Sequence, residues 1–158
     1  MAEYFGAPEA VWAGKAGLAT MRFVKFVDMQ LTSTQILALH TAAIDVIPAQ
    51  GAGNVAIPIG GIMSYDHGET EYDDNPAAAT NFVFKYGAGD ICCGKVPVDG
   101  FCNAAADKIA YFGGEASLTG LVSATADTAI TVTLGGAITN GDGPINIRVA
   151  YAVLPSGL

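Results

Sequence analysis

Charged residues are scarce in this 158-residue chain: only 14% are Asp, Glu, Lys or Arg, against about 25% in typical globular domains. Positive charge is the scarcer kind, because seven basic residues face fifteen acidic ones and the net charge is −8. Phosphate backbones and anionic membrane surfaces attract clustered Lys and Arg, and here the basic residues are scattered. We therefore expect neither a nucleic acid nor a membrane as a partner.

Long apolar runs are also missing, since none approaches the roughly 20 residues that span a bilayer. The first twenty residues, MAEYFGAPEAVWAGKAGLAT, contain Glu3, Pro8 and Lys15. They lack the basic start and continuous apolar stretch of a secretory signal. We therefore expect the protein to be made and assembled in a reducing cytoplasm.

Cysteine is limited to Cys92, Cys93 and Cys102. No second close pair or nearby His completes a zinc set, and an odd count excludes a closed internal disulfide framework. If Cys92 and Cys93 lie in a strand they point to opposite faces, so one can pack inside while the other is exposed. An intersubunit disulfide through these cysteines is one hypothesis, and reduced packing thiols are the other. A catalytic pair of Cys92 or Cys93 with His40 or His67 lacks any recognisable nucleophile turn.

Short segments rich in β-branched and aromatic residues, separated by Gly-rich turns, predict strands. These segments are 21–31, 42–49, 55–66, 80–87, 117–125, 128–135 and 144–155. In 21–31 apolar residues occur on both faces, and Gly60-Gly61 predicts a bulge. The turn TNGDG at 139–143 predicts that the last two strands form a hairpin. The segment 91–112, broken by Gly and Pro, has no clear assignment.

The last strand alternates regularly, which predicts one core face and one face of small or polar residues able to meet a neighbour. The core face has Ile145, Ile147, Val149, Tyr151 and Val153, and the other face has Asn146, Arg148, Ala150 and Ala152.

The predicted fold is all-β: a β-sandwich, jelly-roll-like, with one short helical turn and an extended N-terminal arm. Thr32 or Ser33 is expected to cap the helical turn, which buries Ile36, Leu37 and Leu39. One such turn cannot supply the crossovers of a parallel sheet. We predict an N-terminal arm at 1–20 and a single β-sandwich domain at 21–158, large enough to build a core without disulfides or metal.

The arm at residues 1–20 has no regular period and contains the only Trp of the chain. One interpretation is a partly disordered terminus. The other is an arm that docks on a neighbouring subunit through Tyr4, Phe5 and Trp12, because aromatic residues are enriched in interface cores.

The acidic loop SYDHGETEYDDNP at 64–76 is the richest polar cluster. Its carboxylates could hold calcium, but their spacing does not match an EF-hand, and a solvated loop is the preferred interpretation. The calcium candidates are Asp66, Glu69, Glu71, Asp73 and Asp74. No Gly-rich segment fits a phosphate loop, so we expect no cofactor, no catalytic residues and no enzymatic activity.

Three segments carry a resemblance. LTSTQILALHTAAIDVIPAQGAGNVAIPI at 31–59 resembles the opening of a group of small tailed-bacteriophage structural proteins, with a Thr/Ser start, an LLALH-type turn and a strand ending in P-x-x-G-x-G. SYDHGETEY at 64–72 and the closing TNGDGPINIRVAYAVL resemble other segments of that group. The resemblance covers 30–154 with a poor match over 88–126, and the N-terminal segment and the Cys-bearing stretch 91–102 depart from the pattern.

The resemblance implies a non-enzymatic virion component made in the host bacterial cytoplasm. A capsid decoration (cement) protein fits first: it would bind the outside of the major capsid lattice and stabilise the head. Its partners would be the major capsid protein and further copies of itself, in a homotrimer or other closed ring. The alternative is a tail- or fibre-associated protein that binds host glycans through Tyr65, Tyr72 or Tyr86, for which core packing is the competing interpretation.

Overall fold

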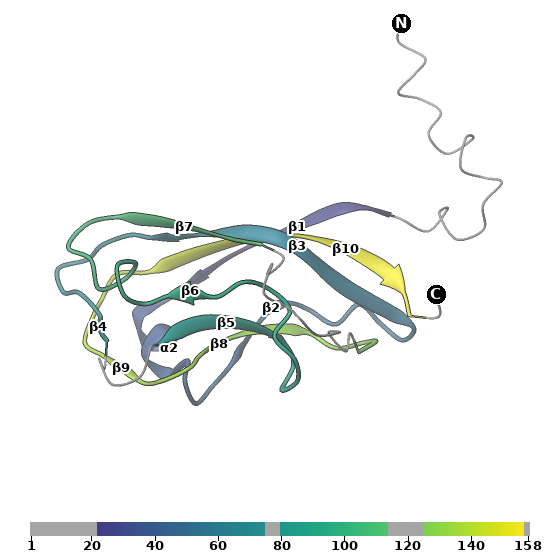
Figure 1. The fold of residues 1–158 in the computed structure, drawn as a ribbon, viewed down its shortest axis with the longest axis horizontal. Helices are drawn as coiled ribbons and strands as arrows, with labels where there is room; N and C mark the ends of the chain where they lie inside the picture. Colours follow the sequence, from purple (N-terminus) through teal and green to yellow (C-terminus); the bar gives the residue numbers. More distant parts are fainter. Residues whose placement is uncertain (1–21, 75–79, 114–124, 157–158) are drawn as a thin grey trace, which may run out of the picture.

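Two antiparallel sheets stacked face to face form the body of the protein in the computed structural model, which describes residues 22–74, 80–113 and 125–156 (Figure 1). The first sheet has the order β1 (Arg22–Leu31), β10 (Ile145–Pro155), β3 (Asn54–Tyr65) and β7 (Lys108–Gly113). The second has the order β2 (Ile44–Ile47), β8 (Ile130–Leu134), β5 (Asn81–Tyr86) and β6 (Val96–Pro97). The prediction of an all-β fold is confirmed.

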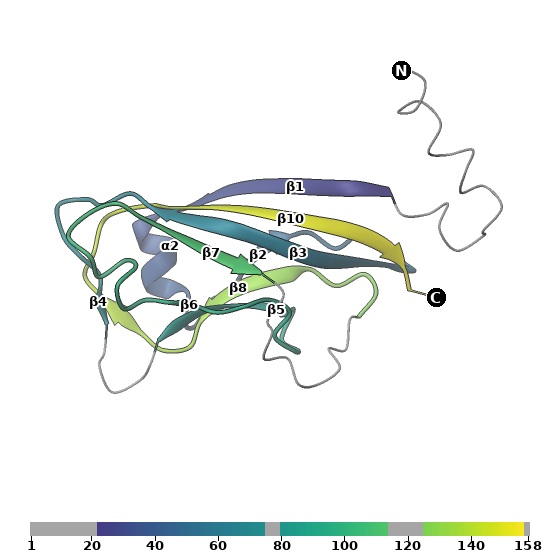
Figure 2. The ribbon, with the colours of Figure 1, turned by 45° about the horizontal axis from the view of Figure 1, so that its top comes forward.

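Strands that follow one another in the sequence mostly lie in different sheets. Among the strands of the two sheets from β1 to β8, each connection leads from one sheet to the other, except the connection from β5 to β6. The last strand, β10, lies between β1 and β3. This is the order expected for a jelly roll, and we interpret the sandwich as jelly-roll-like. A small pair, β4 (Asp73–Asp74) and β9 (Ile138–Thr139), lies at the end of the sandwich where β10 begins (Figure 2).

The core lies between the two sheets, and β10 shows how the sequence places it there. Ile145, Ile147 and Val149 are buried while Asn146 and Arg148 are exposed, so the predicted alternation of β10 is confirmed.

Direct contacts join the two layers. The ring of Phe84 on β5 stacks on Phe112 of β7, with centroids 4.4 Å apart. The hydroxyl of Tyr86 donates to the carbonyl of Ala56 over 2.7 Å. The first contact buries aromatic surface, and the second satisfies a buried polar group.

The single helix of the described residues, α2 (Ser33–Ala38), begins with a capping box. The N–H of Gln35 donates to Oγ1 of Thr32, and the N–H of Thr32 donates to the side chain of Gln35 over 2.9 Å. This arrangement satisfies backbone donors that a helix start leaves free. Ile36 and Leu39 are fully buried, and Leu37 packs partly against the core. The predicted capped turn is confirmed, with Thr32 as the cap.

The predicted hairpin around 139–143 is wrong. β8 lies in the second sheet and β10 in the first, and between them the chain forms β9 and pairs with β4. The turn chemistry itself is as expected, because Asn140 and Gly141 adopt positive φ of 55° and 87°. A turn sequence determines the local backbone, whereas pairing depends on which distant strand is available.

The expected strand at 42–49 forms as β2, without strict alternation of buried and exposed residues. Val46 and Ile47 are both buried, because the register of β2 against β8 shifts between Asp45 and Ile47. The bulge expected in β3 is confirmed beside Gly60: Ala150 pairs with Gly60 but Tyr151 pairs with Pro58, which leaves Ile59 as the extra residue.

Two predictions fall outside the described residues. They are the arm at 1–20 with Tyr4, Phe5 and Trp12, and residues 117–124 of an expected strand. The domain division at residue 20 stays a prediction.

Candidate interaction surface

One face of the first sheet is not covered by the second sheet (Figure 2). Directly opposed residues of antiparallel strands point to the same side, so the residues in register with Asn146, Arg148 and Ala150 point away from the core. We call these residues the outer face. Row by row across the strands they are Phe26, Ala150, Gly60 and Gly113; Asp28, Arg148, Ile62 and Tyr111; and Gln30, Asn146, Ser64 and Ile109.

Large apolar side chains stand exposed on the outer face. Phe26 exposes 66% of its surface, Ile109 62% and Tyr111 80%. Val24, two positions before Phe26, is also exposed. Large apolar side chains gathered on one face are commonly covered by a partner. This concentration on one side of the sandwich therefore marks the outer face as a surface for a protein partner.

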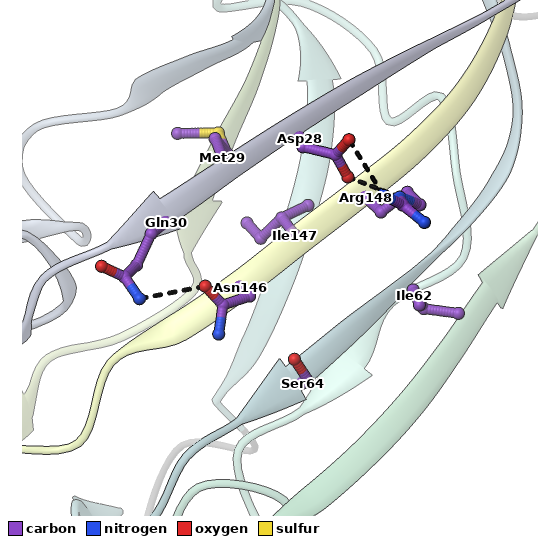
Figure 3. A pocket seen from close by; sticks show the side chains of 8 residues that line it. All are labelled: Asp28, Met29, Gln30, Ile62, Ser64, Asn146, Ile147 and Arg148. Atoms are coloured by element: carbon purple, nitrogen blue, oxygen red, sulfur yellow. Dashed lines mark hydrogen bonds and ion pairs between the residues drawn. The ribbon is translucent and has the colours of Figure 1, made fainter.

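The charged side chains of the outer face neutralise each other at one side of a hollow (Figure 3). Arg148 donates to the carboxylate of Asp28 through both Nε and Nη2, the second bond measuring 3.1 Å. Beside this ion pair, Nε2 of Gln30 donates to Oδ1 of Asn146 over 3.0 Å. These bonds pair the polar side chains of β1 and β10 with one another, so they are satisfied before any partner binds.

The chemistry of the hollow does not favour catalysis. The hydrogen bond from Arg148 holds the pKa of Asp28 below its ordinary value, and the same bond raises the pKa of Arg148. A carboxylate held ionised by a paired guanidinium is a weak general base. In the part of the chain that the structure describes, no His or Cys lines this hollow.

Both edge strands of the first sheet have a lysine on the core-facing side. Lys25 of β1 lies opposite Tyr151, and Lys108 of β7 lies opposite Tyr65. The rings of both tyrosines belong to the core. Both lysines are exposed at the rim of the sandwich. β1 also has a register shift between Arg22 and Lys25. Inward-pointing lysines and bulges are the devices that keep an edge strand from adding another strand.

The acidic loop and the closing turn, far apart in the sequence, are bonded together. The carboxylate of Asp142 accepts hydrogen bonds from the N–H groups of Glu69 and Thr70, over 3.2 and 3.0 Å. The hydroxyl of Tyr72 donates to the carbonyl of Gly143 over 2.7 Å. Two of the three segments that carry the phage resemblance thus form one unit at the end of the sandwich.

The calcium candidates do not form a cluster in that unit. Asp66, Glu69 and Glu71 are exposed, and Asp73 accepts a hydrogen bond from Asn140. Among the residues with described side chains, which exclude Asp74, no group of three or more His, Cys, Asp or Glu could hold a metal ion.

All three cysteines are buried thiols that form no disulfide among the described residues. The expectation that Cys92 or Cys93 is exposed is wrong, because the segment makes one isolated bridge at Ile91 and does not continue as a strand. The hydrogen bond with Cys92, together with burial, raises the pKa of the Cys93 thiol. A thiol that stays protonated is a poor nucleophile. The intersubunit disulfide stays a prediction, and it would require this segment to open.

The tyrosines proposed for glycan binding belong to the core. Tyr65, Tyr72 and Tyr86 expose 1%, 0% and 4% of their surface, so the core-packing interpretation is the right one. Among the residues whose burial is described, the exposed aromatic side chains are Phe26 and Tyr111, and neither was among the candidate site residues predicted from the sequence. A signal existed for Phe26, because apolar residues occupied both faces of 21–31. Tyr111 lay in the unassigned segment 91–112.

No helix among the described residues is long and apolar enough to cross a bilayer.

The chain is similar to one solved structure. No family model matches the chain, and no curated protein matches it. Among solved structures, the chain is similar to one from the cyanophage Pam1 capsid asymmetric unit, at 19% identity and a TM-score of 0.45, with 84% of each chain covered.

Proposed function

We propose that this protein is a structural component of a bacteriophage virion: a decoration protein that binds the outside of the major capsid lattice and stabilises the head. The observation that carries the proposal is the outer face, which exposes Phe26, Ile109 and Tyr111 and whose two charges cancel on a chain of net charge −8. Large apolar side chains exposed on one face favour a protein partner. The resemblance of three sequence segments to tailed-phage structural proteins indicates in which assembly that partner lies.

Compact construction supports the same role. Bonded loops at one end and a capped helix tie the sandwich together. On a symmetric shell, modest contacts repeated by each copy of a closed ring add up to strong attachment. We expect the ring to be a homotrimer or another closed oligomer, as the lattice axes of a shell require.

Binding to shells that lack the protein is the direct test. Purified full-length chain should cosediment with such shells, saturate at a stoichiometry set by the lattice, and raise the temperature at which the shells disrupt. A chain lacking residues 1–20 should keep its circular dichroism spectrum and lose occupancy. Absence of full-length binding at every concentration overturns the proposal. A copy number of only a handful per particle would indicate the tail instead.

A further inference from the structure

We propose that the outer face is the binding site for residues 1–21 of a second copy of this chain, with Trp12 as the main anchor. The inference rests on the proposed assembly role and names the partner of that same surface. Four observations carry it: the protection of the sheet edges, the lining of the face, its charge, and the length of chain before β1.

Both edges of the first sheet are protected against the addition of another strand, which leaves the outer face as the place for a partner. Lys25 and Lys108 lie on the core-facing sides of the two edge strands, and β1 has a register shift beside Lys25. A strand added at either edge would bring its own core-facing side chains against a lysine. No lysine protects the outer face, where the charges of Asp28 and Arg148 are already paired.

The lining suits a segment that carries aromatic anchors. Ala150, Gly60 and Gly113 form a low strip across three strands, next to the exposed rings of Phe26 and Tyr111. Aromatic rings prefer edge-to-face or offset contacts with other rings, and small side chains leave room for them. Residues 1–21 contain Tyr4, Phe5 and Trp12.

Charge also permits this pairing. The only charged residues in 1–21 are Glu3, Glu9 and Lys15. The segment is therefore nearly neutral, as is the outer face, so that the two can meet without the repulsion that the net charge of −8 imposes on other surfaces.

The segment is long enough to reach a second copy. Ten residues lead from Trp12 to Arg22, which begins β1, and they can span about 33–36 Å. Phe26 lies only four residues beyond Arg22, about 13 Å along β1. The connection is more than twice as long as this distance along β1, so the segment can extend past its own sheet to a second copy. In a closed ring each copy would give one segment and receive one.

Trp12 is the only tryptophan, so its fluorescence reports on the segment alone. The test mixes two full-length variants. The donor, Ala150→Arg, has an intact segment and a blocked face. The acceptor, Trp12→Asp, has an intact face, no anchor and no tryptophan. Ala150 is only partly buried on its outward side, so the donor should keep the native circular dichroism spectrum and melting temperature. Tyr111→Ala, at a side chain 80% exposed, is a second donor that leaves the core intact.

Trp12 emission of the donor should be that of an exposed indole when the donor is alone. Adding acceptor should move the emission to shorter wavelength and saturate at one acceptor per donor. An acceptor that also carries Ala150→Arg should produce no shift, whereas one carrying Ala38→Arg, the same change on exposed α2, should behave as the plain acceptor. No shift on mixing overturns the inference. The unmodified protein gives a second check. If it emits at the shorter wavelength and dilution does not change this, the segment binds the face of its own chain, and the inference is overturned as well.

The two proposals fail in different experiments. A successful mixing experiment without binding to shells leaves the segment exchange standing and removes the decoration role. Binding to shells without any shift on mixing does the reverse.

Discussion

Tyr72 and Gly141 show how single residues connect the two loops at the end of the sandwich. Gly141 has φ of +87°, and a Cβ there would collide with the ring of Tyr72. The Tyr72 hydroxyl in turn donates to the carbonyl of Gly143. Glycine is therefore required twice over at position 141, by the backbone conformation and by the close approach of the ring.

Substitution at these two positions should separate the two requirements. Gly141→Ala should lower the free energy of unfolding by about 2–4 kcal/mol, because the positive φ and the overpacking both contribute. Gly100→Ala is the matched control: its φ is +73° but nothing lies within 4 Å of the added Cβ, so only about 1 kcal/mol is expected. Tyr72→Phe should cost about 1–2 kcal/mol through the unsatisfied carbonyl. Urea titration measures all three, and equal losses for the two glycines would contradict the collision.

At the scale of elements, β10 has two roles that its alternation separates. Its core-facing side chains are the centre of the first sheet, with β1 and β3 on either side, and its outward side chains form the middle of the outer face. Position along β10 thus decides whether a substitution affects stability or association.

Neighbouring truncations in β10 should differ sharply. Ile147→Ala removes a fully buried side chain and should cost about 2–5 kcal/mol. Asn146→Ala, on the exposed side, should stay within about 0.5 kcal/mol of the native free energy of unfolding. Chemical denaturation of the two variants checks this, and comparable losses would show that β10 is not buried on one side only.

The capping box of α2 leads to a second prediction about a single element. Thr32→Ala should lower the free energy of unfolding by about 1 kcal/mol, since the N–H of Gln35 loses its acceptor. Thr34→Ala, an exposed position inside α2, is the control and should have little effect. Thermal denaturation compares the two, and a larger effect at Thr34 would exclude Thr32 as the cap.

For the whole molecule, the buried tyrosines couple folding to alkaline pH. Burial raises the pKa values of Tyr65, Tyr72 and Tyr86 above the ordinary value, which is near 10. Below about pH 10 both states hold these protons, and their contribution to stability is complete. Above about pH 10 the unfolded chain loses protons that the folded chain keeps, so the free energy of unfolding falls as pH rises towards the native pKa values.

Stability should therefore decline steeply above about pH 10. Urea midpoints measured from neutral pH upwards should show the decline, and the double variant Tyr72→Phe/Tyr86→Phe should show a smaller slope. The raised pKa of Cys93 adds an earlier decline above about pH 8.5, which Cys93→Ala should remove. A native profile that is flat up to pH 11 would contradict the burial of these groups.

Much of the fold could be predicted because its determinants are local. The alternation of 145–153, the cap at Thr32 and the bulge beside Gly60 each depend on residues within a few positions of one another. The pairing of β10 with β1 and β3 could not be predicted, because every pair joins residues at least 80 positions apart. The turn at 139–143 shows the limit: its φ values followed the sequence, and its pairing did not.

The candidate surface was harder to predict, because a sequence pattern does not show what covers a face. Tyr65, Tyr72 and Tyr86 looked as accessible as Tyr111 in the sequence, yet the first three are core and the last is 80% exposed. The sequence by itself determined which side chains share a face, where α2 begins and which turns need glycine, since these follow from backbone geometry. Only the tertiary structure decided which faces meet and which one stays open, because burial depends on a second layer of sheet that residues far away in the chain supply.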